Sequence, residues 1–424
     1  MDWTETDAKL TRPPFFAFGE DHALFERLRR DDPVHWTEGG VRPFWSVTRH
    51  ADIVAALKDA ETFSSDLGGL IPLSAAPLTP EQRHAGGYGS IPTHTDSPRH
   101  LAVRRPFNKH FAAPAISRMR EVVQRCVDDI IDEVAPLGRC DLVEDVAARL
   151  PARLVCEMMG VPAADHAMIQ RHCAAFMGAQ DPAYQIDGDA PKTQRFHMAA
   201  IHDYMSTLAI DQRFDPRDDF TGVIGSMEVN GKPLDARDIG WWAFAIVVAG
   251  LETTRDALAV GMRELMRTPE QAERLRADPT LAPAAVEEFV RWSNPSKHKF
   301  RVATRDVEFG GKRIAQGDWV MCWLVSANRD ERVFDDPYRF DIGRKPNPHL
   351  GYGVGEHSCL GRHLARLEIE LMLNALLQRL PDLAIDRDER WLMCNNHTAL
   401  VSLPVRFSVP LASVEGTCDV HAIG

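Results

Sequence analysis

Residues 349–368, HLGYGVGEHSCLGRHLARLE, place closely spaced glycines before a single cysteine and an expected helix. A glycine-bearing turn before a helix often binds phosphate, because the helix N-terminus offers free N–H groups. The phosphate patterns do not fit here. The dinucleotide pattern GxGxxG would need glycine at Glu356 or Ser358, and a Walker loop would need Gly-Lys-Ser/Thr. These glycines therefore do not predict a phosphate site.

What remains is a tight turn that presents Cys359 at the start of a helix. A thiolate there is stabilised by the helix dipole and the free N–H groups, and glycines allow a flat ligand to approach the backbone. A single thiolate in such a place suits a haem iron. A buried cysteine packed as a small hydrophobe explains the segment about equally well. The expected buried face of the following helix comprises Leu360, Leu364, Leu367 and Leu371.

The segment resembles the haem-binding loop of the cytochrome P450 family, aromatic-Gly-x-Gly-x-His/Arg-x-Cys-x-Gly. Tyrosine stands where phenylalanine is commoner. The resemblance, to the bacterial soluble type, implies a mainly α fold with smaller β-sheets. It also implies a long central helix over haem b and iron ligation by one thiolate. The matching positions are Tyr352, Gly353, Gly355, His357, Cys359 and Gly361.

Glu288 and Arg291 lie three residues apart, so they can pair on one helix face. A solvated surface pair of little energetic value is the ordinary explanation. In the family this spacing is the ExxR motif, which supports the core behind the haem together with a later segment, here 328–340. The resemblance implies a structural role for Glu288, Arg291 and Arg339, while Glu287 is out of register.

An uninterrupted helical pattern runs from Asp235 to Arg267, about 33 residues or about 50 Å, and is apolar nearly all round at its centre. Residues 249–254, AGLETT, break this pattern. A capped kink would explain them. The family resemblance instead implies a groove for dioxygen, with Glu252 and Thr253 as a catalytic acid–alcohol pair that delivers protons.

His100 and Arg104 are four residues apart and share a helix face. A basic solvent-facing surface is the alternative explanation. The resemblance implies that both bind haem propionates, together with Arg301 and His357. Four cationic or polar groups suit two carboxylates, because buried charges need partners.

By analogy with the family, the substrate pocket is lined partly by the Gly- and Pro-rich segment 66–92, which we expect to be a long loop. Most of the other expected lining residues are apolar, so a small hydrophobic molecule is expected. Lys297 or His298 could meet a polar group of the substrate, although side chains turned to solvent or to a propionate are the simpler explanation. The expected substrate-binding residues are Ala245, Ile246, Ala249, Lys297, His298, Thr398 and Ala399.

The composition excludes several classes of protein. The formal net charge of −12 argues against a general nucleic-acid binder. The N-terminus lacks a leader pattern, and the longest apolar run, 239–251, is too short to cross a bilayer. Eight scattered cysteines without a CxxC pair predict no disulfide framework. We therefore expect a cytoplasmic protein with no membrane anchor.

No linker or repeat divides the chain. We expect an N-terminal tail over residues 1–11, one haem-thiolate domain over 12–412 and a C-terminal tail over 413–424, as a monomer. Short strands are expected within 31–48, 300–325 and 383–410, and helices over 51–62 and most of 98–278.

The resemblance implies a monooxygenase that inserts one oxygen atom from O2 into a terpenoid, steroid or aromatic substrate, most simply by hydroxylation. Its electrons would come ultimately from NAD(P)H through a ferredoxin reductase and a ferredoxin, because the chain contains no flavin or nicotinamide module. A peroxide-driven haem-thiolate enzyme and a non-catalytic haem sensor are the alternatives, and the Glu252–Thr253 pair argues against both. Candidate ferredoxin-docking cations are Arg105, Lys109, Arg362 and Arg366.

Overall fold

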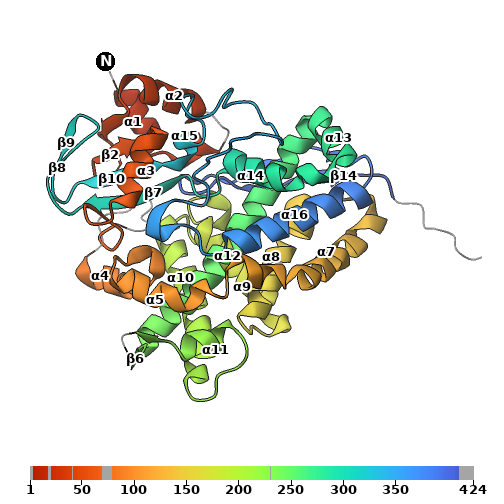
Figure 1. Ribbon diagram of the computed structural model, residues 1–424, viewed down its shortest axis with the longest axis horizontal. Helices are drawn as coiled ribbons and strands as arrows, with labels where there is room; N and C mark the ends of the chain where they lie inside the picture. The colour runs from red at the N-terminus through yellow and green to blue at the C-terminus, as the bar shows by residue number, and fades with distance from the viewer. Residues whose placement is uncertain (1–2, 18–20, 41, 69–78, 230, 410–424) are drawn as a thin grey trace, which may run out of the picture.

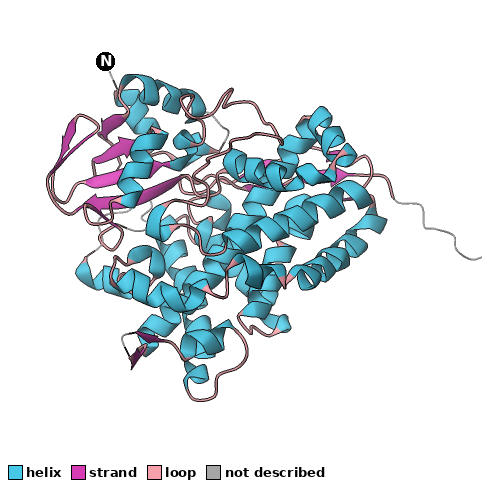
Figure 2. Ribbon diagram, in the orientation of Figure 1, coloured by secondary structure: helices cyan, strands magenta, loops and turns pink. Residues whose placement is uncertain are grey.

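The protein is described here from a computed structural model, in which residues 3–17, 21–40, 42–68, 79–229 and 231–409 are placed. Helices make up most of the molecule, and the largest sheet lies at one end beside the N-terminal helices (Figures 1 and 2). The mainly α fold with smaller β-sheets, expected from the sequence, is confirmed.

The α-helices are α1 (Thr4–Leu10), α2 (Asp21–Asp31), α3 (His50–Lys58), α4 (Pro80–Ala85), α5 (Arg99–Asn108), α6 (Ala113–Ser117), α7 (Arg120–Val134), α8 (Arg149–Met158), α9 (His166–Met177), α10 (Ala190–Ile210), α11 (Phe220–Gly225), α12 (Ala236–Arg267), α13 (Pro269–Ala277), α14 (Ala282–Ser293), α15 (Leu324–Ala327) and α16 (Arg362–Arg379). The 3₁₀ segments are η1 (Pro13–Phe16), η2 (Pro92–His94), η3 (Ala135–Leu137), η5 (Ala163–Asp165), η6 (Pro182–Tyr184), η7 (Asp211–Arg213), η8 (Pro279–Leu281) and η9 (Gly355–His357), and η4 (Leu142–Ala147) is a π-helix.

The strands are β1 (Val34–Thr37), β2 (Phe44–Val47), β3 (Phe63–Ser64), β4 (Arg139–Asp141), β5 (Glu228–Val229), β6 (Lys232–Pro233), β7 (His298–Ala303), β8 (Val307–Phe309), β9 (Lys312–Ile314), β10 (Trp319–Trp323), β11 (Ala384–Ile385), β12 (Arg390–Trp391), β13 (Leu400–Ser402) and β14 (Pro404–Arg406).

The long central helix is α12, and it confirms the helical pattern predicted over 235–267. Asp235 caps it, because its carboxylate accepts a hydrogen bond from the Asp238 N–H over 2.8 Å. The helix is buried along most of its length and packs against α8, α10, α14 and α16. A Cβ on Gly250 would meet Val155 Cγ2 at 2.7 Å, so the close contact with α8 requires glycine at this position.

The five-stranded sheet has the order β1-β2-β10-β7-β3, with β2 and β10 parallel and the other neighbours antiparallel. Every residue of β10 is buried, because separate apolar clusters cover the two faces of the sheet. On β7, alternate side chains point to the same face, so Lys299 and Arg301 project together. The sheet therefore carries two cations on one face, on a strand that lies between β10 and β3.

Several expected elements are confirmed: β1 and β2 fall within 31–48, and α3 (His50–Lys58) begins one residue before the predicted 51–62 and ends inside it. The turns expected at Gly310–Gly311 and Gly317 contain glycines with positive φ angles. Segment 66–92 is not a loop throughout, because a capping box formed by Thr79 and Gln82 starts α4 there. Residues 69–78 of that segment lie outside the described residues.

The N-terminal segment expected as a tail contains α1, and Leu10 at its end is fully buried against the sheet cluster. Residues 4–10 therefore pack on the body of the protein. The expected tail over 413–424 lies outside the described residues. In the described part of the chain, none of the helices combines the length and apolar character that crossing a membrane requires.

Candidate functional site

Cys359 lies in a turn whose shape depends on two glycines. Gly353 and Gly355 have φ angles of 67° and 78°, in the left-handed region. A Cβ on Gly355 would also meet the Leu57 carbonyl oxygen at 2.9 Å. The Cys359 N–H donates to the Tyr352 carbonyl oxygen over 2.7 Å and closes the turn. The Cys359 side chain is partly exposed and precedes the first residue of α16 by three positions.

The surroundings of Cys359 act on its pKa in two directions. Burial raises the pKa of the thiol. The Gly361 N–H, which donates toward the sulfur, and the nearby cations Lys299, Arg104 and Arg362 lower it. A metal ion bound to the sulfur would remove the proton outright. The cations are therefore placed to stabilise a thiolate once a metal ligates it.

The middle of α12 bears an accessible stripe on an otherwise buried helix. Ala245, Ile246, Gly250 and Thr253 are partly exposed and Ala249 is exposed, while their neighbours on both sides are buried. Positions four residues apart share one helix face, so these residues form one accessible face of α12. Because α12 packs against α16, we infer that this stripe and the Cys359 turn border the same interior space.

Two imidazoles lie together beside the Cys359 turn, one from α5 and one from the turn itself. The ring centroids of His100 and His357 are 4.0 Å apart. Among the described residues, none hydrogen-bonds either ring nitrogen of His100 or the Nε2 of His357, which lies 3.6 Å from Glu356 Oε1. Burial lowers the pKa of His100, and that of His357 to about 2. Neutral imidazoles with free nitrogens are available as hydrogen-bond donors to an anion.

Three cations, Arg104, Arg301 and Lys299, lie close enough to lower the pKa of His357. Arg104 donates to the carbonyl oxygens of Glu356 and Ser358, over 2.9 Å in the first case. Arg301 is buried and donates to the Phe300 carbonyl oxygen over 2.8 Å.

Sequence reasoning missed Lys299, which is partly buried, hydrogen-bonds Ser296 over 2.9 Å and has its pKa lowered to about 8 by burial. Its alternation with Arg301 on β7 was the signal that could have identified it.

A metal ion is a second possible occupant of this corner. Ligand atoms of His100, Glu356 and His357 all lie within 4.8 Å of one another. The guanidinium groups of Arg104 and Arg301 lie close enough to lower the pKa of His357. That positive surrounding disfavours a cation and favours carboxylates such as haem propionates.

Glu252 and Thr253, the acid and alcohol expected to deliver protons, each have a different partner in this structure. Thr253 Oγ1 donates to the Ala249 carbonyl oxygen over 2.9 Å, back along its own helix. The Glu252 side chain is 2% exposed and pairs with Arg255. Arg255 also holds Asp256, which the sequence did not single out. Thr253 faces the interior space, whereas Glu252 is held away from it.

Glu288 and Arg291 form a fully buried ion pair, with Nε–Oε2 and Nη2–Oε1 distances of 2.7 Å. The remaining donors of Arg291 reach the carbonyl oxygens of Asn328, Pro337 and Arg339 over 2.8, 2.9 and 3.2 Å. The pair therefore fastens α14 to the segment 328–340, in keeping with a structural role.

Arg339 contributes to this network only through its carbonyl oxygen, and its side chain is exposed. The guanidinium that approaches Glu288 belongs to Arg344, with Nε 3.4 Å from Oε2. Asn347 Nδ2 also donates to Glu288 Oε2, over 3.2 Å. The sequence analysis assigned the third residue of this network to Arg339, five positions before Arg344. No local spacing specifies which arginine of the irregular segment turns inward.

Glu287, set aside by the sequence analysis, joins the two ends of the Cys359 loop. Its carboxylate lies 3.0 Å from His349 Nε2. It also accepts hydrogen bonds from Arg366 Nε over 2.5 Å and from Arg366 Nη2 over 2.9 Å. The Arg366 guanidinium lies 4.6 Å from the Tyr352 ring centroid. These contacts hold the pKa of Glu287 at about 2 against the effect of burial.

The residues expected to bind substrate fall into two groups. Ala245, Ile246, Ala249 and Thr398 are accessible, and the first three lie on the α12 stripe. The other three, Lys297, His298 and Ala399, are 1–2% exposed.

The two polar members of the buried group are hydrogen-bonded within the chain. Lys297 Nζ donates to Thr398 Oγ1 over 2.8 Å, and His298 Nε2 lies 2.9 Å from Asn396 Oδ1. They lie behind the accessible surface, not on it.

The site fits a haem. It offers one accessible thiol on a glycine turn, unpartnered imidazoles beside guanidinium groups, and an accessible stripe on the facing helix. A Cβ on Gly361 would meet nothing within 4 Å, so the backbone borders open space there. The residues that could hold the group are Cys359, His100, Arg104, Lys299, Arg301 and His357.

Comparisons with known proteins agree with this geometry. The model of the cytochrome P450 family matches residues 192–411. The chain is 34% identical to "Putative cytochrome P450 126" of Mycobacterium tuberculosis over 412 residues, 92% of this chain and 95% of that protein. It is 35% identical to the "Methyl-branched lipid omega-hydroxylase" of Mycobacterium bovis over 416 residues, 95% of each.

Among solved structures, the Mycobacterium marinum cytochrome P450 CYP268A2 in complex with pseudoionone superposes with a TM-score of 0.85. The two proteins are 32% identical, and the match covers 92% of this chain and 95% of the other. An accessible cysteine on a glycine turn, a buried Glu–Arg pair and a long central helix thus occur in a chain that matches its relatives over nearly its whole length. The chain belongs to the cytochrome P450 family of monooxygenases.

Proposed function

We propose that this enzyme hydroxylates a small, largely apolar substrate at a haem ligated by Cys359. The observation that supports this most directly is that the Cys359 turn and one stripe of the otherwise buried helix α12 are both accessible. When bound, haem supplies the oxygen activation and the insertion of one oxygen atom into a C–H bond. The protein supplies the thiolate, the orientation of the substrate and the exclusion of water.

In this proposal the histidines and arginines at the edge of the space bind the propionates. His100 and His357 supply the free ring N–H donors, and Arg104 and Arg301 supply charge. Tyr352 closes the turn through its carbonyl oxygen, and Gly353 and Gly361 keep side chains away from the haem face. Charge-assisted hydrogen bonds of this kind are about twice as strong as neutral ones.

Thr253 and Glu252 are proposed to deliver protons. Thr253 Oγ1 faces the interior space and can exchange its bond to Ala249 for one to a bound molecule. Glu252 must leave Arg255 before its carboxyl group can pass a proton toward that space. The pKa of Glu252 is raised by burial, which favours the protonated form that can act as an acid.

The substrate class follows from the accessible lining and from the relatives. Ala245, Ile246 and Ala249 present an apolar surface, and Thr398 adds one hydroxyl. One relative is named as a hydroxylase of methyl-branched lipids, and one structural neighbour is a complex with pseudoionone. We propose a branched-chain lipid, terpenoid or steroid, bound by apolar contacts with one polar contact.

The electron donor is proposed to be a ferredoxin, reduced from NAD(P)H by a reductase, in the cytoplasm. Arg105 and Lys109 are exposed and available for an acidic partner. Arg362 is half-buried and donates to the Cys359 carbonyl oxygen over 3.2 Å, and Arg366 is paired with Glu287. The docking charge therefore rests mainly on Arg105 and Lys109.

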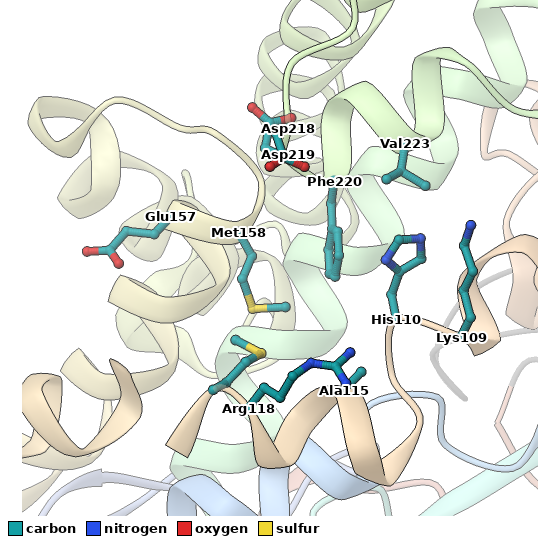
Figure 3. Close-up of a pocket in the computed structure, with 11 residues that line it drawn as sticks. Lys109, His110, Ala115, Arg118, Glu157, Met158, Asp218, Asp219, Phe220 and Val223 are labelled. Carbon is teal, nitrogen blue, oxygen red and sulfur yellow. The ribbon is translucent and has the colours of Figure 1, made fainter. Parts of the chain in front are cut away.

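Lys109 also lines a surface pocket of about 550 Å3. Figure 3 shows Asp218 and Asp219 at the top of it, Arg118 at the bottom, and Lys109 and His110 on the right, with Phe220 beside His110. Its cations face carboxylates across the pocket, so it does not add to the positive docking surface.

The first experiment is the difference spectrum of the dithionite-reduced protein with carbon monoxide, for the wild type and Cys359→Ser. The proposal expects a strongly red-shifted Soret band that disappears in the variant. A band typical of histidine ligation in both proteins would overturn it. Turnover of branched lipids, terpenoids and steroids with a ferredoxin system and with hydrogen peroxide then decides the oxidant. Turnover with peroxide alone would contradict the proposed electron donor.

A further inference from the structure

Arg255 lies between two carboxylates in the interior, one turn beyond the accessible stripe of α12. Its Nη1 pairs with Glu252, and its Nε and Nη2 donate to Asp256 Oδ1 over 2.9 and 2.7 Å. The side chains of Arg255, Glu252 and Asp256 are 12%, 2% and 1% exposed. Among the described residues, neither carboxylate has a second ion-pair partner.

One guanidinium cannot neutralise two buried carboxylates, so the cluster is unfavourable with both acids ionised. It is relieved when one acid keeps its proton. Burial raises the pKa of Glu252, and that of Asp256 to about 7, against the opposing effect of Arg255. The two acids therefore compete for an ion pair with Arg255. The acid that carries the proton is neutral and no longer forms that ion pair.

The other titratable groups around the cluster come from each element packed against it. The pKa values of Cys173, Tyr184 and Cys394 are raised, and that of His397 is lowered to about 3, so these groups stay uncharged near neutral pH. Of these neighbouring groups, Lys297 is the one that carries a charge, and burial lowers its pKa. Their positions are α9 for Cys173, η6 for Tyr184, the segment before β7 for Lys297, and the segment before β13 for Cys394 and His397.

We propose that Asp256 is a positioning residue that controls the release of Glu252 from Arg255. When the single proton of the cluster passes from Asp256 to Glu252, ionised Asp256 holds Arg255 alone and protonated Glu252 becomes free to turn toward Thr253. When Asp256 is neutral, Arg255 stays with ionised Glu252, which then has no proton to deliver. The inference rests on the proposed function, because it assigns a role in the proton delivery of that site.

The structure makes a matched set of variants available. Asp256→Asn removes the competing charge with almost no change in volume, and Asp256→Glu restores it. Asp238→Asn is the control, because Asp238 is also a buried acid on α12 that bonds a serine, Ser90, over 2.6 Å and pairs with an arginine, Arg99. Asp238 and Asp256 are 18 positions apart, about 27 Å along the helix.

The measurement is coupling, the product formed per NAD(P)H consumed, at about pH 6, where the cluster keeps its proton, and at about pH 8, above the pKa of Asp256. We expect coupling to fall with rising pH in the wild type, in Asp256→Glu and in Asp238→Asn, because the cluster loses the proton that Glu252 delivers. In Asp256→Asn coupling should be roughly tenfold lower than in the wild type at about pH 6 and independent of pH. A pH profile like that of the wild type in Asp256→Asn would overturn the proposal.

A second readout does not depend on turnover. Because the pKa of Asp256 is raised in the folded protein, its ionisation destabilises the fold as pH rises toward about 7. The melting temperature of Asp256→Asn should therefore exceed that of the wild type at the upper end of the pH range, without haem as well as with it. An unchanged melting temperature there would overturn the buried, competing state of Asp256.

A change in melting temperature without a change in the coupling profile would make Asp256 merely structural and would also overturn the proposal. Failure of the proposed function is a different result. In that case the red-shifted carbon monoxide band would be missing from the wild type itself, while the melting temperatures would still report the ionisation of Asp256.

Discussion

Lys297 Nζ donates to Thr398 Oγ1 over 2.8 Å, and the lysine side chain is only 2% exposed. Thr398 is partly exposed and Lys297 is buried, so a ligand in the interior space would meet Thr398 first. The lysine orients that hydroxyl from behind. This relationship distinguishes a residue that supports the binding surface from one that forms it.

We predict that Lys297→Met leaves the ratio of affinities for an anionic ligand and its neutral ester unchanged. The stability should not fall, because methionine is similar in volume and burial disfavours the lysine charge, lowering its pKa. Spectral titration with a fatty acid and its methyl ester, together with thermal melting, checks both points. A selective loss of affinity for the acid would mean that the ammonium reaches the ligand directly.

We predict that Arg291→Ala destabilises the protein by about 3–5 kcal/mol, because it leaves Glu288 as a buried charge without its main partner. Arg339→Ala is the matched control, because the Arg339 side chain is exposed and only its carbonyl oxygen takes part. It should change stability by less than about 0.5 kcal/mol. Denaturant unfolding measures both, and a similar loss in the two variants would refute the assignment.

Glu368 on α16 is 2% exposed, and its Oε2 has no hydrogen-bond partner among the described residues. Burial raises its pKa to about 8, above the value of about 4.3 in an unfolded chain. The folded state therefore keeps a proton that the unfolded state loses, so this group lowers stability as pH rises from about 4.3 to about 8. Nearly four pKa units correspond to roughly 5 kcal/mol as an upper limit.

Glu368→Gln should remove this loss, so the variant should be more stable than the wild type at high pH and similar to it at low pH. Urea unfolding near pH 5 and near pH 9 measures the difference. An equal stability difference at both pH values would show that Glu368 does not titrate in this range.

Gly355 and Gly311 offer a matched test of the Cys359 turn. Both have positive φ angles, 78° and 75°, so alanine costs about 1–2 kcal/mol of backbone strain at either position. Only at Gly355 would the new Cβ meet a backbone atom, the Leu57 carbonyl oxygen at 2.9 Å. We expect Gly355→Ala to lower haem content, measured from the ratio of Soret to protein absorbance, and Gly311→Ala to retain it. Equal haem content would mean that the turn tolerates the shift.

The sequence predicted the parts of this protein that local spacing determines. The Cys359 turn, the Glu288–Arg291 pair and the α12 helix each follow from residues a few positions apart. The family resemblance added the order of these motifs along the chain and the fold that joins them.

The sequence could not predict which of several long charged side chains turns toward the protein interior. Arg344 approaches Glu288 although Arg339 was expected, and the sequence did not indicate that Glu252 is held by Arg255. Lys297 is buried although its polarity suggested a contact with ligand. Each case involves a flexible charged side chain with several partners in reach, and tertiary packing decides among them.

The contacts of Glu287 have a consequence for how the protein acquires its cofactor. One carboxylate is bonded to His349 before the Cys359 turn and to Arg366 after it, so the loop is closed at both ends by contacts within the polypeptide. Its conformational entropy is lost when the chain folds and not when the cofactor arrives. Binding then orders little further backbone in this loop, and the cofactor meets a receptor that is already preorganised.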